Sequence, residues 1–198
     1  MTSLLARWLH ATLARLALPG RLAGLWWRGR EHPGWRVGWS ERLAVGGARV
    51  RRGAIWLHAE TAAEVQQAGL VMGELRQLNP GWRFLLSQSE VEGRIEGLAL
   101  LAPGDMQVWL PFDTPGASRR FLRRHRPCAG LLMEGMNRPH LLHAAARAGV
   151  PMMVANARLS PAELKRAERR RALMAPAFQR LALVLAQSHE DARRLAKA

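Results

Sequence analysis

The sequence is poor in cysteine, lysine and aromatic residues. Its one cysteine, Cys128, has no partner for an internal disulfide, which is consistent with a reducing compartment. Aromatic residues make up 6% of the chain and hydrophobic residues 48%, so we expect a core built mainly of aliphatic side chains. A chain of 198 residues with this composition is long enough for one well-buried α/β domain with a short appendage.

The usual signatures of cofactor and metal sites are also missing. The sequence has no Gly-x-Gly-x-x-Gly string and no phosphate-binding loop ending in Gly-Lys-Ser/Thr. It has no pair of cysteines at metal-ligand spacing, and His140 and His143, three residues apart on a predicted helix, have no third ligand in sequence reach. We therefore predict no bound cofactor and no metal, and interpret both histidines as ordinary surface residues.

Acidic residues are scarce relative to basic ones. The chain has 30 basic and 15 acidic residues, a formal net charge of +15, and 28 of the 30 basic residues are arginine. Because guanidinium groups pair bidentately with phosphate, we expect an anionic partner such as phospholipid or nucleic acid. Two arginine-rich runs, 119–126 and 165–171, suggest binding to nucleic acid. Such runs usually form solvated helix faces, however, and no known nucleic-acid recognition motif accompanies them. Nucleic-acid binding is the less favoured interpretation.

No run of about 20 apolar residues occurs, so the sequence offers no membrane-spanning helix. Residues 2–27 instead place leucines and tryptophan at helical spacing, with Arg7, His10 and Ala14 on the opposite side. This pattern is typical of a helix that lies in a membrane interface, although a helix packed on its own domain would look similar. We predict a basic, Trp-rich, membrane-associating segment over 1–48, whose membrane contacts are Leu5, Trp8, Leu9, Leu13, Leu16, Trp26 and Trp27.

From residue 49 to 198 the pattern alternates between short apolar runs and helical segments. The predicted strands are 54–58, 82–87, 106–110, 128–133, 151–155 and 181–186. The predicted helices are 62–78, 115–125, 138–148, 161–178 and 190–197. Repeated β-α units of this kind predict an α/β fold, a Rossmann-like parallel sheet flanked by helices, with its functional edge at the carboxyl ends of the strands.

Polar residues follow the first predicted strand at that edge. His58 ends the strand, and Thr61 and Glu64 open the next helix. The Thr-x-x-Glu spacing is that of a capping box, which satisfies free helix amides. A carboxylate at this edge can also accept a proton from a sugar hydroxyl, so both interpretations stand.

Two later strands also end in polar residues. Glu134 follows the fourth strand, where it faces the cleft or pairs with an arginine. Asn156 and Arg158 leave the fifth strand, and Ser160 starts another Ser-x-x-Glu cap. Arg158 is suited to an anionic sugar or phosphate, while a turn stabilised by Asn156 is the alternative explanation for this segment.

These strings resemble those of the 3-deoxy-D-manno-octulosonic acid (Kdo) transferases. In that family the first strand ends in His-Ala-x-Ser-x-Gly-Glu-Val, which is similar to residues 58–65. The later strings Pro-Tyr/Phe-Asp, Met-Glu-Thr-Glu-x-Trp-Pro-Asn and Ala-Asn-Ala-Arg-Leu-Ser resemble residues 111–113, 133–140 and 155–160. Residues 183–192 and the basic segment 33–43 are similar as well, so the resemblance covers nearly the whole chain.

The resemblance implies the acceptor domain of a two-domain GT-B glycosyltransferase, which transfers Kdo from CMP-Kdo to a lipid A precursor without a metal. Glu64 would be the general base and Glu134 a second acid of the cleft. Substrate contacts would come from His58, Thr61, Asn156, Arg158 and Ser160. The implied location is the cytoplasmic face of the inner membrane, as a peripheral protein in contact with anionic lipid.

The chain also departs from the family pattern. Thr61 and Ala63 replace the family's Ser and Gly, and Met136, Arg138 and His140 replace its second Glu, its Trp and its Asn. The donor domain, expected to bind most of CMP-Kdo, would follow beyond residue 198. We therefore expect a truncated enzyme, one half of a split enzyme that pairs with a separate donor-domain polypeptide, or a non-catalytic membrane-bound paralogue.

Overall fold

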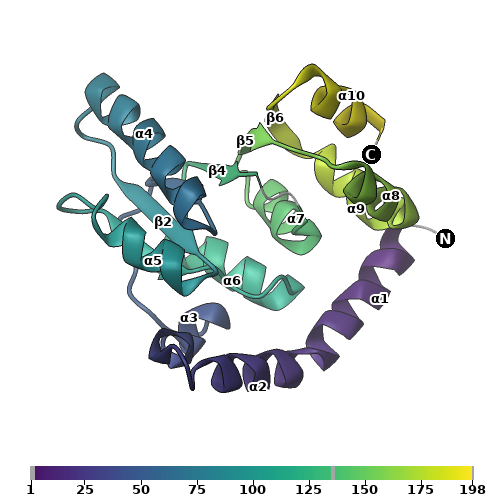
Figure 1. Ribbon diagram of the computed structural model, residues 1–198, viewed down its shortest axis with the longest axis horizontal. Helices are drawn as coiled ribbons and strands as arrows, with labels where there is room; N and C mark the ends of the chain where they lie inside the picture. The colour runs from purple at the N-terminus through teal and green to yellow at the C-terminus, as the bar shows by residue number, and fades with distance from the viewer. Residues whose placement is uncertain (1–2, 135–136, 198) are drawn as a thin grey trace.

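The computed structural model describes residues 3–134 and 137–197, so Met136 lies outside the described residues. A single six-stranded sheet runs through the molecule in the order β3-β2-β1-β4-β5-β6, with every neighbouring pair parallel (Figure 1). Its strands are β1 (Ile55–His58), β2 (Phe84–Gln88), β3 (Met106–Trp109), β4 (Ala129–Met133), β5 (Met152–Ala157) and β6 (Leu181–Ala186). The predicted Rossmann-like parallel sheet is confirmed, and all six predicted strands occur within about two residues of their expected bounds.

Helices cover both faces of the sheet. They are α1 (Ser3–Leu16), α2 (Leu18–Arg28), the 3₁₀ turn η1 (Pro33–Arg36), α3 (Trp39–Arg42), α4 (Ala62–Leu78), α5 (Val91–Leu98), α6 (Pro115–His125), α7 (Pro139–Arg147), α8 (Pro161–Arg169), α9 (Arg171–Phe178) and α10 (His189–Lys197). Helix α4 packs in the apolar layer on one face, with α5 beside it, and α6 and α7 pack in the layer on the other face. The first strand, β1, lies near the centre of the sheet, and β2 and β3 follow it outward on one side. The chain then returns to β4 on the other side of β1, which places a topological switch point between β1 and β4.

The core is two apolar layers, one on each face. Alternate residues of a strand point to opposite faces, so the neighbours Trp56 and Leu57 of β1 enter different layers. Trp56 packs with Phe121 of α6 at 5.0 Å between ring centroids, while Leu57 packs in the layer that contains Met72 of α4. Aliphatic side chains make up most of both layers, as the low aromatic content predicted.

Two helical predictions need correction, and one helix was missed. The segment predicted as one helix over 2–27 forms two helices, because Pro19 in the first turn of α2 has no backbone N–H to continue the helical hydrogen bonds of α1. The helix predicted over 161–178 is interrupted at Arg170, whose φ and ψ are −109° and 19°. Helix α5 was not predicted at all, because its glycines lower helix propensity. A side chain at Gly93 would meet the backbone oxygen of Glu60 at 2.2 Å, so this glycine permits close packing.

Helix α1 turns its small residues inward and its large apolar residues outward. Ala6, Ala11 and Ala14 are buried, and Ala6 packs on α9. The six large side chains of the helix, Leu4, Leu5, Trp8, Leu9, Leu13 and Leu16, are each more than half exposed, and Trp8 reaches 69%. Trp26 and Trp27 of α2 are exposed too, with the guanidinium of Arg30 at 4.0 Å from the Trp27 ring centroid. In the described parts of the chain, no helix combines the length and apolarity needed to cross a bilayer.

The rest of the predicted 1–48 segment packs on the sheet. Arg42 of α3 is 4% exposed, and its guanidinium lies 3.8 Å from the ring centroid of Trp109 on β3. The carboxylate of Glu41 accepts the backbone N–H of Trp109 at 2.9 Å. The outer strand β3 is therefore covered by the segment that precedes the first strand.

Candidate functional site

The switch point brings together the two acidic residues that the sequence singles out. Helix α4, which carries Glu64, begins directly after β1, and Glu134 directly follows β4. Because β1 and β4 are parallel neighbours, their carboxyl ends meet at the same edge of the sheet. Open α/β sheets bind ligands at this position, so the carboxyl edge between β1 and β4 is the candidate site.

Glu64 is held by the start of its own helix. Its Oε2 accepts the backbone N–H of Glu60 at 3.0 Å, and its Oε1 accepts the hydroxyl of Thr61 at 3.2 Å. The Thr61 hydroxyl also accepts the backbone N–H of Glu64 at 3.2 Å, so Thr61 is the N-cap of α4. The predicted capping box is only half formed, because the Glu64 carboxylate accepts the N–H of Glu60 rather than that of Thr61. A carboxylate has about four lone-pair positions, so these contacts fix its orientation and leave acceptor capacity.

The electrostatic surroundings make Glu64 a better base than an ordinary glutamate. Partial burial raises the pKa of Glu64, and the negative charges of Glu60 and Glu134 raise it further. The hydrogen bonds from Glu60 N–H and Thr61 oppose this shift. The charge of Glu134 therefore reaches Glu64, although Glu64 itself does not line the pocket beside Glu134.

Glu134 is connected to α4 through Asn156. The Nδ2 of Asn156 donates to Oε1 of Glu134 at 2.8 Å and to Oε1 of Gln67 at 3.3 Å. Gln67 follows Glu64 by three residues and so lies on the same face of α4. The sequence did not single out Gln67, since an isolated glutamine on a helix carries no signal without knowledge of the strand opposite.

Both strand-end residues adopt the left-handed backbone region. The φ angles are 58° for Glu134 and 54° for Asn156, and Asn156 lies at an irregularity in the pairing of β5 with β6. A left-handed glutamate is uncommon and strained relative to the usual regions, whereas asparagine tolerates this region well. Strained backbone of this kind concentrates at binding and catalytic sites.

A pocket of about 400 Å³ opens beside Glu134. Three arginines, Arg158, Arg166 and Arg170, line it together with Asn137 and Glu163. Arg158 is exposed, so its guanidinium is available to an anionic ligand. Ser160 does not line this pocket; it caps α8, accepting the N–H of Glu163 at 3.3 Å and donating its hydroxyl to that carboxylate at 2.7 Å.

His58 is 1% exposed, so it lies beneath the site rather than at its surface. Its Nε2 lies 3.3 Å from Oε1 of Glu60, and its Nδ1 lies 3.1 Å from the hydroxyl of Ser87. Nδ1 also lies 2.9 Å from the backbone carbonyl oxygen of Ser87, which can only accept a hydrogen bond. Burial lowers the pKa of His58, and the acceptors Glu60 and Ser87 oppose that shift.

Glu60 also forms an ion pair with Arg138. The hydrogen bond from His58 and the charge of Arg138 lower the pKa of Glu60 to about 2. The sequence did not identify this pair, because its members lie 78 residues apart. Arg138, a departure from the family string, thus neutralises the carboxylate nearest to Glu64 in sequence.

Asp113, from the Pro-Phe-Asp string, caps the start of α7 from a distant part of the chain. Its carboxylate accepts the backbone N–H groups of Leu141 at 2.8 Å and His140 at 3.2 Å. Burial raises the pKa of Asp113 to about 6. His140 itself is 2% exposed, so the prediction that it is a surface histidine was wrong. Within residues 3–134 and 137–197, no group of three His, Cys, Asp or Glu side chains is arranged to hold a metal ion.

Comparison with known families agrees with this arrangement. The N-terminal domain model of the family described as 3-deoxy-D-manno-octulosonic-acid transferase (kdotransferase) matches residues 37–198. The chain belongs to the Kdo transferase family. The expectation drawn from the strand-end strings is thereby confirmed at the level of the family.

Several Kdo transferases are similar to most of this chain. The 3-deoxy-D-manno-octulosonic acid transferase of Bordetella pertussis is 38% identical over 92% of this chain and 45% of its own length. That of Haemophilus influenzae is 26% identical over 72% of this chain and 33% of its own length. The chain therefore spans less than half the length of these curated relatives.

A solved structure shares the fold. A protein from Listeria monocytogenes assigned as a UDP-N-acetylglucosamine 2-epimerase superposes with a TM-score of 0.51 at 10% identity, over 74% of this chain and 42% of that one. At this identity the likeness concerns the fold alone. It agrees with the wound parallel sheet seen in this member of the Kdo transferase family.

Proposed function

We propose that this chain is the acceptor-side half of a glycosyltransferase that transfers Kdo from CMP-Kdo to a lipid A precursor in lipopolysaccharide biosynthesis. The observation that carries the proposal is the position of Glu64 at the switch point, oriented by two hydrogen bonds, with a raised pKa and with Glu134 close by. Membership of the Kdo transferase family supports the choice of sugar and acceptor.

In the proposed reaction, Glu64 accepts the proton of an acceptor hydroxyl. The hydroxyl oxygen then forms a bond to the anomeric carbon of Kdo, and CMP leaves with the electrons of the broken bond, inverting that carbon. A base with a raised pKa holds the transferred proton more firmly than an ordinary carboxylate, which favours this step. The reaction as proposed needs no metal or cofactor.

The other residues of the site hold and orient the substrates. Arg158, with Arg166 and Arg170, supplies positive charge for the carboxylate of Kdo or a phosphate of the acceptor. Asn156 fixes the side chain of Glu134 and keeps it facing the pocket. Thr61 and Ser160 contribute chiefly by starting α4 and α8, and His58 acts on substrate only indirectly, by positioning Glu60.

The donor nucleotide is proposed to bind mainly to a second domain. The relatives are more than twice as long as the part that this chain matches, and GT-B enzymes bind their donor between two domains. A donor domain, in the same protein or in a separate polypeptide, is therefore the expected partner of this domain.

The exposed faces of α1 and α2 are proposed to hold the protein on the cytoplasmic face of the inner membrane as a peripheral protein. Leu5, Leu9 and Leu13 would enter the lipid, and Trp26 and Trp27 with their arginine neighbours would lie at headgroup level. Removing residues 4–27 is expected to release the chain from vesicles that contain anionic lipid, measured by flotation.

The central test is a transfer assay with CMP-Kdo, a lipid A precursor and a polypeptide that supplies the donor half. Glu64→Gln keeps an oxygen that accepts the N–H of Glu60 but is a poor base, so transfer is expected to fall by about 100- to 10,000-fold. Glu74→Gln, which removes the same charge from an exposed position of the same helix, is the matched control and is expected to keep full activity.

The same assay separates this proposal from its main alternative. If the wild-type chain transfers no Kdo in the presence of the donor half, or if Glu64→Gln is as active as Glu74→Gln, the general-base role is wrong. A non-catalytic membrane-bound scaffold would then be the better description, provided that removal of residues 4–27 still releases the chain from vesicles.

A further inference from the structure

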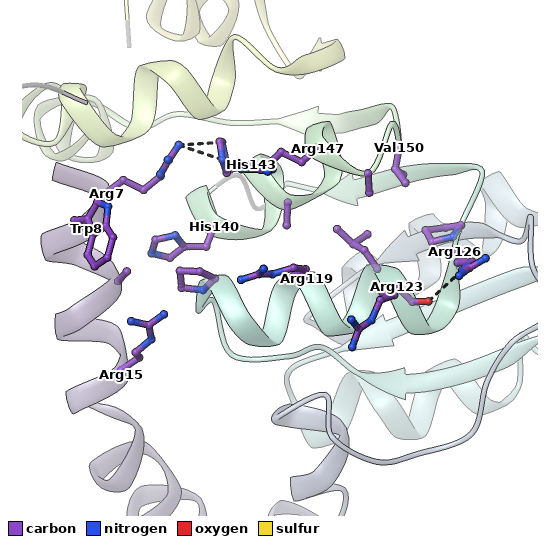
Figure 2. A pocket seen from close by; sticks show the side chains of 16 residues that line it. Arg7, Trp8, Arg15, Arg119, Arg123, Arg126, His140, His143, Arg147 and Val150 are labelled. Carbon is purple, nitrogen blue, oxygen red and sulfur yellow. Dashed lines mark hydrogen bonds between the residues drawn. The ribbon is translucent and has the colours of Figure 1, made fainter. Parts of the chain in front are cut away.

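A second and larger pocket lies away from the carboxylates, between α1, α6 and α7. Its volume is about 730 Å³, within the range typical of ligand sites, and Figure 2 shows its walls. Arginines from all three helices and two histidines of α7 surround it, over a floor of small and apolar side chains. The lining residues used below are Arg7, Trp8, Arg15, Arg119, Arg123, Arg126, His140, His143 and Arg147.

The pocket concentrates positive charge without a counter-charge. Six of its lining residues are arginines and none is Asp or Glu. Across residues 3–134 and 137–197, none of these six arginines takes part in an ion pair. Like charges gathered at the mouth of a partly enclosed space repel each other, and a multivalent anion removes that repulsion.

The arginine run of α6 divides into two sets with different roles. Arg120 and Arg124 turn to the preceding segment, where they donate to the carbonyl oxygens of Leu43 at 2.7 Å and Gly47 at 2.8 Å. Arg119, Arg123 and Arg126 are exposed and line the pocket instead. Arg119 and Arg123, four residues apart, lie on one face of α6, where they can act together on one ligand. Arg126 lies just beyond the helix, as its C-cap in the left-handed region, and lines the same pocket.

The histidines respond to the same charge. Nδ1 of His10 lies 2.9 Å from Nε2 of His140. The guanidinium of Arg7 lies 3.1 Å from Nε2 of His143, as the dashed lines in Figure 2 mark. Burial first, then the charges of His10 and Arg7 among others, lowers the pKa of His140 to about 4. Burial, and then the charge of Arg7, also lowers the pKa of His143. The rings of His140 and His143 therefore add hydrogen-bonding groups to the pocket rather than further positive charge.

We propose that this pocket binds the phosphate headgroup of an anionic membrane lipid, with a preference for a phosphomonoester. Planar guanidinium groups match the oxygens of such a phosphate, and a phosphomonoester carries up to two negative charges. This site is separate from Glu64 and does not depend on the proposed transfer reaction.

A lipid is favoured over a nucleic acid by what surrounds the pocket. Helix α1 forms one wall, so the arginines of α6 face a partly closed space rather than an open surface on which a duplex could lie. Trp8 lines the pocket and is also 69% exposed, and the leucines next to it on α1 face outward. A headgroup bound here would have its acyl chains beside the apolar face of α1.

Vesicle flotation at about 0.15 M salt tests the proposal. Vesicles of phosphatidylcholine are compared with vesicles that also contain phosphatidylglycerol, a phosphodiester, or phosphatidic acid, a phosphomonoester. We expect the full chain to bind phosphatidic acid vesicles most strongly and phosphatidylcholine vesicles least. Inorganic phosphate, which has the charge but no acyl chains, is expected to compete only at high concentration.

Matched double variants locate the site. Arg119→Gln with Arg123→Gln removes two pocket charges, and we expect binding to phosphatidic acid vesicles to weaken by about tenfold or more. Arg169→Gln with Arg193→Gln removes two exposed charges on α8 and α10 outside the pocket, and is expected to weaken binding by less than about threefold. Thermal unfolding of all forms checks that each variant is folded.

Several results would overturn the proposal. Equal losses in the two double variants would mean that net charge, not the pocket, attracts the membrane. Equal binding to phosphatidylglycerol and phosphatidic acid would remove the phosphomonoester preference. Tighter binding of a short RNA duplex at the same salt, lost in the Arg119/Arg123 variant, would assign the pocket to nucleic acid instead.

Discussion

Helices α4 and α8 begin with the same pattern at the same edge of the sheet, yet their glutamates differ in acidity. Thr61 and Ser160 are the N-caps, and Glu64 and Glu163 are the third residues of the two helices. Burial raises the pKa of Glu64, whereas hydrogen bonds from Ser160 lower the pKa of Glu163. A capping motif therefore determines where a carboxylate is placed, and the groups around it determine whether it can act as a base.

The difference has a clear physical origin. Glu64 is half-buried and has two carboxylates, Glu60 and Glu134, as electrostatic neighbours. Glu163 is exposed and close to Arg158 and Arg166, whose positive charges favour its ionised form. The proposed general base is thus the one cap glutamate of the two that is surrounded by negative charge.

The largest effect is expected at Asn156, whose side chain holds Glu134, one of the two carboxylates that raise the pKa of Glu64. Asn156→Ala removes the hydrogen bonds that Asn156 donates to Glu134 and Gln67, and it places alanine at a φ of 54°. The free energy of unfolding should therefore fall by about 2–3 kcal/mol. Asn156→Gly loses the same hydrogen bonds without the backbone cost, so it should be less destabilised by about 1 kcal/mol. Urea unfolding of both variants measures the difference, and equal losses would show that the left-handed backbone is not strained.

A second prediction tests whether the two caps are equivalent as caps. Thr61→Ala and Ser160→Ala each remove one side-chain acceptor from a helix start, so each should cost about 1 kcal/mol of unfolding free energy. Urea unfolding at neutral pH is the measurement. A loss confined to one helix would contradict the view that the motif is the same at both positions.

The smallest effect concerns pH. Since the folded pKa of Glu64 is raised, its contribution to stability is present in acid, below the unfolded pKa, and is lost as the pH rises through the folded pKa. The contribution of Glu163 has the opposite sign: it is present above the unfolded pKa and is lost as the pH falls through its lowered pKa. Glu163→Gln should therefore reduce the loss of stability on acidification, and Glu64→Gln should increase it, measured by thermal unfolding between neutral pH and pH 4. Shifts of the same sign in the two variants would contradict these pKa directions.

Much of the fold could be predicted because parallel sheets leave a plain signal. Inner strands such as 129–133 are continuous apolar runs, and breakers separate them from amphipathic helices. The outer strand 181–186 has the same apolar sequence pattern, although most of its side chains are exposed. Helix α5 was not predicted, because its glycines lower helix propensity in the sequence. These glycines allow close approach to neighbouring backbone and side chains, a requirement that only the folded structure shows. The breaks after α1 and α8 were missed because helical periodicity continued across them.

The site was only partly predictable, for a related reason. Glu64 and Glu134 could be found because each follows a strand in sequence, and the fold brings strand ends together. The link through Gln67 and the ion pair between Glu60 and Arg138 depend on contacts between distant segments. The pocket of α1, α6 and α7 was missed for the same reason, since its arginines looked like a solvated helix face.

The alanines on the inner face of α1 set how firmly that helix is attached. Methyl groups bury little apolar area, so Ala6, Ala11 and Ala14 hold α1 with much less free energy than leucines would provide. Local opening should begin there, with backbone amides of α1 exchanging with solvent deuterium well before those of β1 and β2. A helix held by so little apolar area is expected to exchange the protein surface for another apolar phase without unfolding the domain behind it.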